Sequence, residues 1–176
     1  VHTLDNPLFG HILELGADLA FLQEANREIV DKAKNDRKIN SEYPYIGIYS
    51  GSTNIAYRSR FPVVGQESIH FENSENGCLY LKILVGSDTL AVYNCHLQSN
   101  KLNEKEITEY HQFIKNPTDS THYKASRKVL KNLLESTSQR AVQARMIADR
   151  ASKETARYTI VCGDFNDTPL SYSYWV

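Results

Sequence analysis

The sequence lacks several features that mark whole classes of protein. Its 176 residues include no run that approaches the roughly 20 apolar residues of a membrane span. It has three cysteines, Cys78, Cys95 and Cys162, and neither their odd number nor their spacing suits a disulfide framework or a zinc site. We therefore expect free, buried thiols. Reduced cysteines are compatible with the cytoplasm, but the sequence leaves localisation open.

Charge of either sign is not in excess. The chain carries 20 basic and 21 acidic residues, for a formal net charge of -1. No global field would draw such a chain onto a nucleic-acid backbone or an anionic membrane, so any polyanion site must be local. A phosphate-cradling glycine loop is also missing, which disfavours a nucleotide-binding oxidoreductase.

Hydrophobic periodicity and turn residues predict a mixed fold in one domain. We expect, in order, a helix at 7–15, a strand at 18–23, a charged helix at 25–38, strands at 43–49 and 54–57, an extended segment at 61–64, a hairpin of 78–85 with 89–94, a polar irregular stretch at 101–123, helices at 124–135 and 138–155, and a strand at 158–162. Adjacent strands without intervening helices favour a mixed or antiparallel sheet covered by helices.

Polar residues follow three of these apolar strands. Glu24 follows the first, Asn94 and His96 follow the second, and Asp164 and Asn166 follow the last. If those strand ends share one rim of the sheet, the five side chains surround a single pocket. Gly163 permits a tight turn and close backbone approach at the last of them.

The side chains at these strand ends suit metal-assisted phosphoester chemistry. Oxygen-rich ligands select a hard cation, and magnesium accepts one or two protein carboxylates while keeping several waters. Glu24 is the first candidate ligand. Asp164 is placed to accept a proton from an attacking water or to align it, Asn166 presents an amide donor and a carbonyl acceptor, and protonated His96 can donate to a phosphoryl oxygen.

Each residue also has a simpler interpretation. A glutamate after a strand is often a surface residue, and Asp164 with Asn166 can close the strand as an Asx-turn. Arg60 is a candidate phosphate ligand, but isolated arginines are usually solvated or paired with acids. Tyr172 is a candidate stacking residue beside Asp164, but aromatics after a strand often complete a core.

Five segments stand in order along the chain: ADLAFLQE at 17–24, NIAYRSRFP at 54–62, VYNCHL at 92–97, RAVQ at 140–143 and GDFNDTPLS at 163–171. Taken together, they resemble the endonuclease/exonuclease/phosphatase superfamily of metal-dependent phosphoesterases, which have the DNase I-like fold. The resemblance implies an α+β fold, a four-layer sandwich of two mixed, mainly antiparallel sheets flanked by helices. It also implies that Glu24 binds Mg²⁺ or Mn²⁺, that Asn94 and His96 contact the scissile phosphate, and that Asp164 and Asn166 orient the nucleophilic water. Arg60, Ser171 and Tyr172 are then candidate substrate contacts.

Against the family pattern, the chain lacks an opening strand that ends in asparagine and closing strands that carry a metal-side Asp and an Asp-His pair. We therefore expect residues 1–176 to form a single, incomplete domain, truncated at both ends. The leading hypothesis is a divalent-metal-dependent phosphoester hydrolase acting on a nucleic acid, a lipid head group or a small molecule, with no obligate protein partner evident. The alternative is a non-catalytic binding module that retains the fold.

Overall fold

The structure is a computed structural model that describes residues 7–25, 27–49, 54–100, 102, 104–115, 120–168 and 171. The chain divides into two compact units. The first unit comprises residues 1–96 and 149–164, and the second comprises residues 97–148 and 165–176. Each unit is described by itself. The sequence-based expectation of a single domain stays a prediction.

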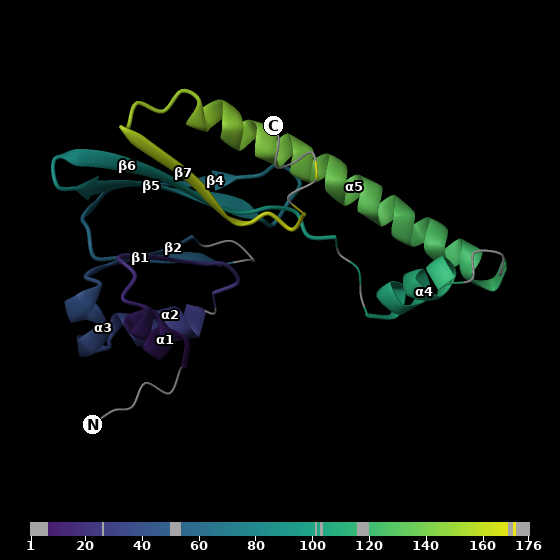
Figure 1. The fold of residues 1–176 in the computed structure, drawn as a ribbon, viewed down its shortest axis with the longest axis horizontal. Helices are drawn as coiled ribbons and strands as arrows, with labels where there is room; N and C mark the ends of the chain where they lie inside the picture. The colour runs from purple at the N-terminus through teal and green to yellow at the C-terminus, as the bar shows by residue number, and fades with distance from the viewer. Residues whose placement is uncertain are drawn as a thin grey trace. The chain divides into compact units, whose positions relative to one another are not determined.

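A small antiparallel sheet opens the first unit. It contains β1 (Leu19–Leu22), β2 (Tyr45–Tyr49) and β3 (Ile55–Ser59) in the order β1-β3-β2. The helices α1 (Pro7–Leu15) and α3 (Arg37–Glu42) lie on one face of this sheet (Figure 1), where Ile12 and Ile39 form a small apolar cluster. The sequence predicted α1 with the bounds that the structure shows.

A larger mixed sheet completes the first unit. It contains β4 (Val63–His70), β5 (Gly77–Val85), β6 (Asp88–His96) and β7 (Tyr158–Asp164), in that order across the sheet. The pairs β4-β5 and β5-β6 are antiparallel, whereas β7 runs parallel to β6. The predicted hairpin is confirmed as β5 and β6, and Gly86 makes the turn between them with a φ of 61°. The fold is therefore mixed α and β, as expected.

The two sheets face one another across an apolar core. The core consists of buried side chains from both sheets: Tyr49, Ile55 and Tyr57 from the small one, and Leu79, Leu81, Ile83 and Val92 from the larger one. Fully burying such a side chain stabilises a fold by about 1.5–3 kcal/mol. Packing in this core holds the two sheets against each other, and with them the ends of their strands.

The charged segment after β1 forms two helices instead of the single predicted helix at 25–38. The first, α2 (Arg27–Lys34), ends before Asp36, which is the N-cap of α3. The Asp36 carboxylate accepts hydrogen bonds from the backbone N–H groups of Lys38 and Ile39 at 2.9 and 3.0 Å. An aspartate with two such bonds starts a new helix, so it interrupts the continuous one.

The second unit is built on two helices, and here the sequence-based prediction was wrong in two places. α4 (Glu104–Lys115) occupies part of the stretch expected to be irregular, and α5 (Ser120–Ala151) is one continuous helix where two were expected. Residues 116–119, which include the predicted break at Asn116 and Pro117, lie outside the described residues. The Ser136 hydroxyl donates to the Asn132 carbonyl at 2.8 Å, so the serine-rich stretch is accommodated within the helix.

The three cysteines are free thiols, as predicted. Cys78 and Cys95 are buried and lie opposite each other on β5 and β6, with their sulfur atoms 3.3 Å apart, whereas Cys162 is half-buried. Burial raises the pKa of the Cys162 thiol to about 11, and burial also raises the pKa of Cys78. Among the described residues, no helix has both the length and the apolar composition needed to cross a bilayer.

Candidate functional site

Three strand-end residues of the first unit meet around one imidazole. The Nε2 atom of His96, at the end of β6, lies 4.0 Å from a carboxylate oxygen of Glu24 and 4.0 Å from one of Asp164. Glu24 follows β1 and Asp164 ends β7, so segments far apart in the sequence supply the three groups. A separation of 4.0 Å is too long for a hydrogen bond and leaves room for a bridging oxygen atom.

The parallel pairing of β7 with β6 places Asp164 beside His96. The register pairs Cys95 with Gly163 and His96 with Asp164. Gly163 has a φ of 129°, and a Cβ atom at this position would lie 1.9 Å from the Cys95 carbonyl oxygen. Only glycine allows this approach. The expected close approach is therefore present, but β7 continues through Gly163 to Asp164 instead of stopping at a turn.

Glu24 and His96 differ in exposure. His96 is 2% exposed and its Nδ1 atom has no hydrogen-bond partner within the described part of the chain, whereas the Glu24 side chain is 75% exposed. Glu24 also has a φ of 53°, in the left-handed region that a non-glycine residue adopts at an energetic cost. Such strain and an unsatisfied buried donor or acceptor are features that cluster at functional sites.

Asn94 is held inside the first unit by two hydrogen bonds. Its side-chain oxygen accepts a hydrogen bond from Gln23 at 2.5 Å, and its side-chain nitrogen donates to the Ala56 carbonyl at 3.4 Å. The side chain is fully buried. Asn94 thus connects β6 to the residue that precedes Glu24, and its predicted contact with a scissile phosphate stays a prediction.

The donor set around His96 suits a hard cation with a largely aqueous coordination shell. Within the described residues, no group of three or more His, Cys, Asp or Glu side chains is arranged to hold a metal ion. Magnesium is commonly bound through one or two carboxylates and several waters, and the exposed carboxylate of Glu24 fits this requirement.

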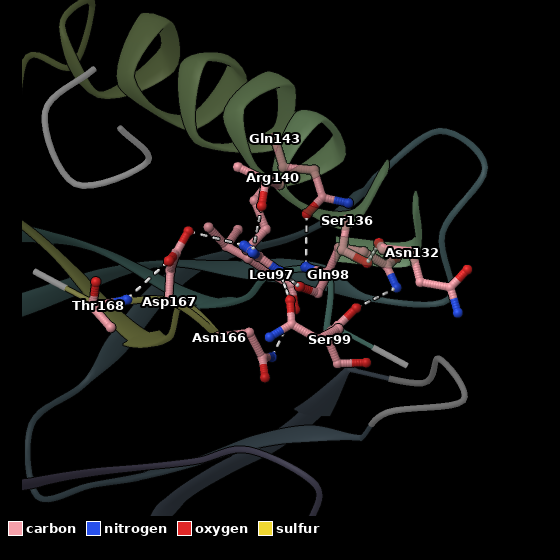
Figure 2. Close-up of polar contacts among 12 residues, drawn as sticks. Leu97, Gln98, Ser99, Asn132, Ser136, Arg140, Gln143, Asn166, Asp167 and Thr168 are labelled. Carbon is pink, nitrogen blue, oxygen red and sulfur yellow. Dashed lines mark hydrogen bonds and ion pairs between the residues drawn. The ribbon is translucent and has the colours of Figure 1, made fainter. Parts of the chain in front are cut away.

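Asn166 lies in the second unit, within a network of polar contacts (Figure 2). Its side-chain nitrogen donates to the Leu97 carbonyl at 2.9 Å, and its φ is 52°. Asparagine adopts this left-handed conformation more readily than most residues. Its predicted role in orienting a water stays a prediction.

A family model of the endonuclease/exonuclease/phosphatase family matches residues 5–176, nearly the whole sequence. The chain belongs to this family. The match confirms the resemblance drawn from the five sequence segments. A comparison with curated proteins gives no match.

Solved structures show the same fold at low sequence identity. A humanized TDP2 of D. rerio is 15% identical with a TM-score of 0.63, over 92% of this chain and 58% of that one. D. rerio TDP2 with a single-strand DNA product is 18% identical with a TM-score of 0.62, over 92% of this chain and 53% of that one. Sphingomyelinase C from Streptomyces griseocarneus is 20% identical with a TM-score of 0.62, over 95% of this chain and 59% of that one.

These matches establish the fold class predicted from the sequence. The endonuclease/exonuclease/phosphatase chain has two sheets, one antiparallel and one mixed, with helices, in the DNase I-like arrangement. It spans between about half and three fifths of the length of these three structures. Glu24, His96 and Asp164 thus lie close together in a chain that has the fold of this family.

Arg60 does not lie with these residues. Its backbone N–H donates to the Asp18 carbonyl, and its side chain forms ion pairs with Asp18 and Glu42 at 3.4 and 3.2 Å. Asp18 and Arg60 are at the opposite end of the β1-β3 pair from Glu24, and the four residues of β1 span about 13 Å. The predicted substrate contact of Arg60 stays a prediction, and its observed partners are acids of the same unit.

The remaining predicted substrate contacts lie at the end of the chain. Ser171 is half-buried in the second unit, and its backbone N–H donates to the Thr168 carbonyl at 2.9 Å. Tyr172 lies outside the described residues. Both contacts therefore stay predictions.

Two residues that the structure associates with the site had no predicted role. Gln23 bonds to Asn94, as described above, and His70 ends β4 in the register row that continues through Gly77 to His96 and Asp164. The Nδ1 atom of His70 lies 2.7 Å from the buried Tyr49 hydroxyl. His70 is exposed, and only the strand register shows that it lies in the same row as His96 and Asp164.

Proposed function

We propose that this chain belongs to a divalent-metal-dependent hydrolase of phosphoester bonds. The observation that carries the proposal is the arrangement of Glu24, His96 and Asp164 around the His96 Nε2 atom. Membership of the endonuclease/exonuclease/phosphatase family supports the same reaction class. The three groups come from the ends of three different strands, so the folded sandwich assembles them.

We assign the metal to Glu24. Its exposed carboxylate is the oxygen ligand for Mg²⁺ or Mn²⁺, which when bound would neutralise charge that develops on the phosphoryl oxygens. Waters and substrate oxygens would supply the other ligands, as is usual for magnesium.

The proton of the attacking water goes to Asp164. As the water oxygen forms its bond to phosphorus, the bond from phosphorus to the leaving-group oxygen breaks, and the Asp164 carboxylate accepts the water proton. The half-exposed Asp164 carboxylate is accessible for this transfer. Its neighbour His96 donates from Nε2 to a phosphoryl oxygen, and Asn166 orients the water or the phosphate through its carboxamide.

The site and the fold support a reaction class but do not favour one class of substrate. Among the structures of this fold, one is a TDP2 with a single-strand DNA product and another is a sphingomyelinase C. A net charge of -1 gives no advantage to a nucleic acid over a lipid head group or a small phosphoester. We therefore propose the phosphoester bond itself as the common target.

The test is hydrolysis by the full-length protein of bis(p-nitrophenyl) phosphate, a diester, and p-nitrophenyl phosphate, a monoester, with Mg²⁺ or Mn²⁺. We expect Glu24→Gln and Asp164→Asn each to lower kcat/KM by at least about 100-fold, because acid-base and charge-stabilising groups contribute on this scale. The matched control is Glu14→Gln, whose side chain is 82% exposed on α1, and we expect it to have no effect.

Two results would contradict the proposal. If Glu24→Gln keeps the hydrolysis rate within about twofold of the wild type, Glu24 is not the metal ligand. If hydrolysis continues in the presence of a chelator, the reaction does not depend on a metal. Magnesium titration by calorimetry separates the hydrolase from the alternative, a non-catalytic binding module, because a degenerate site would bind no ion in either the wild type or Glu24→Gln.

A further inference from the structure

The polar network of the second unit is built around the buried guanidinium of Arg140. Arg140 lies on α5, is 3% exposed, and uses all three of its side-chain nitrogens (Figure 2). Its Nε atom lies 3.0 Å from an Asp167 carboxylate oxygen, and the same two side chains form an ion pair. Burying a charge in this way is costly unless every donor finds a partner.

The other two nitrogens bind the chain that follows β6 and a neighbouring turn of α5. One donates to the Gln98 carbonyl at 3.0 Å and to the Asn100 side-chain oxygen at 2.7 Å. The other donates to the Thr137 hydroxyl at 3.0 Å. A single guanidinium thus joins α5, the segment after β6 and the segment after β7.

A second residue of α5 strengthens the connection. The side-chain oxygen of Gln143 accepts a hydrogen bond from the backbone N–H of Gln98 at 2.9 Å, and Gln143 is also buried. Arg140 and Gln143 are three residues apart on α5, so they lie on the same face of the helix. The Gln98 backbone is therefore held at both its N–H and its carbonyl.

The segments joined in this way are those that hold Asn166. Asn166 directly precedes Asp167, and its side chain donates to the carbonyl of Leu97, which directly precedes Gln98. Arg140 binds Asp167, which follows Asn166, and Gln98, which follows Leu97. Moving either segment would therefore move the carboxamide of Asn166 or remove the acceptor that fixes it.

We propose that Arg140 is a positioning residue that sets the carboxamide of Asn166 by clamping residues 97–100 to residues 165–168. This proposal deepens the proposed function, because it rests on Asn166 acting on the water or phosphate. Arginine is needed because its planar fork reaches several fixed acceptors at once, whereas lysine offers one ammonium group. The clamp acts through geometry and touches no reacting atom.

The first experiment is a kinetic double-mutant cycle in the full-length protein, with bis(p-nitrophenyl) phosphate as substrate. We expect Arg140→Met to lower kcat at least about tenfold with little change in KM, because small misplacements of a reacting group are costly. In an Asn166→Ala background the same change should have almost no further effect, since the group that it positions is gone. Arg140→Lys should recover only part of the rate.

Arg127→Met is the matched control, because Arg127 is exposed on the same helix. We expect it to leave kcat unchanged. If the effects of Arg140→Met and Asn166→Ala on kcat simply add, or if Arg140→Met lowers only the melting temperature and the folded protein keeps its kcat, the positioning role is wrong.

Hydrogen exchange measures the clamp without any activity. We expect Arg140→Met to speed amide exchange at residues 97–100 and 165–168 while the central strand β5 stays protected, and Arg127→Met to do neither. Unchanged exchange in both segments would overturn the proposal. Because Glu24→Gln tests the hydrolase and exchange tests the clamp, a failure of one is distinguishable from a failure of the other.

Discussion

The sandwich core of the first unit and the polar network of the second unit are stabilised by different kinds of buried side chain. The first unit contains a sandwich core of aliphatic and aromatic groups from two sheets. In the second unit, Arg140, Gln143 and Gln98 are buried and are joined by hydrogen bonds. Apolar burial is non-directional and tolerates swaps that keep volume, whereas a buried guanidinium needs each partner in place. We therefore expect substitutions in the sandwich core to act through stability and those around Arg140 to act through geometry as well.

The largest effect is expected from a cavity in the sandwich core. Leu81 on the central strand β5 is fully buried, and Leu81→Ala should lower the free energy of unfolding by about 2–5 kcal/mol. The matched control in the second unit is Leu134→Ala, because Leu134 is 70% exposed on α5 and should cost less than about 0.5 kcal/mol. Urea unfolding measures both. Equal losses would contradict the burial of Leu81 in the sandwich core.

A smaller effect is expected from removing one charge of the buried pair. Asp167→Asn should cost about 1–3 kcal/mol, because the buried Arg140 guanidinium loses a charged acceptor. The matched control is Asp88→Asn, which removes the partner of the exposed Arg157 and should cost less than about 1 kcal/mol. Urea unfolding at low and high salt checks the difference, since added salt screens only the exposed pair. If Asp88→Asn costs as much as Asp167→Asn, the polar network is not a stabilising element of the second unit.

The smallest effect is a pH dependence that belongs to the first unit. The hydrogen bond from the Tyr80 hydroxyl to Glu154, at 2.7 Å, lowers the pKa of that carboxyl, and bonds from two backbone N–H groups add to the shift. Because the folded-state pKa lies below the unfolded value of about 4.3, the stabilisation is fully present above that pH. It is lost as pH falls through the folded-state pKa.

Glu154→Gln tests this dependence. We expect the variant to melt on the order of 2 °C below the wild type at pH 7 and to approach the wild type as the pH falls toward 3. Thermal melts followed by circular dichroism at several pH values give the comparison. A melting difference that grows on acidification would show that the sign of the shift is wrong.

Local sequence signals predicted most elements of the first unit. The spacing of Leu8, Ile12 and Leu15 predicted α1, and β-rich runs around a glycine turn predicted the hairpin of β5 and β6. These signals are local, because helix periodicity and turn chemistry depend on neighbouring residues. The break between α2 and α3 was missed, although Asp36 is a typical N-cap residue.

The second unit was harder to predict. Its polar stretch at 104–115 reads as a surface loop, yet it forms α4, and an ion pair of 3.0 Å between Glu106 and Lys128 joins it to α5. Two helices, at 124–135 and 138–155, were expected, but Ser136 bonds back to a helix carbonyl and α5 continues through this stretch. A contact distant in sequence thus supports α4, and a hydrogen bond from serine to its own helix supports the continuous α5.

The sequence by itself determined which side chains could carry the chemistry and that they follow strands, because strand-forming runs and the polar residues after them are local features. Only the tertiary structure decided that the carboxylates of Glu24 and Asp164 each lie 4.0 Å from the His96 Nε2 atom, and that Arg60 pairs instead with acids at the other end of the β1-β3 pair. The reason is strand direction and register. A parallel β7 beside β6 and the close approach at Gly163 are set by pairing between segments that lie more than sixty residues apart.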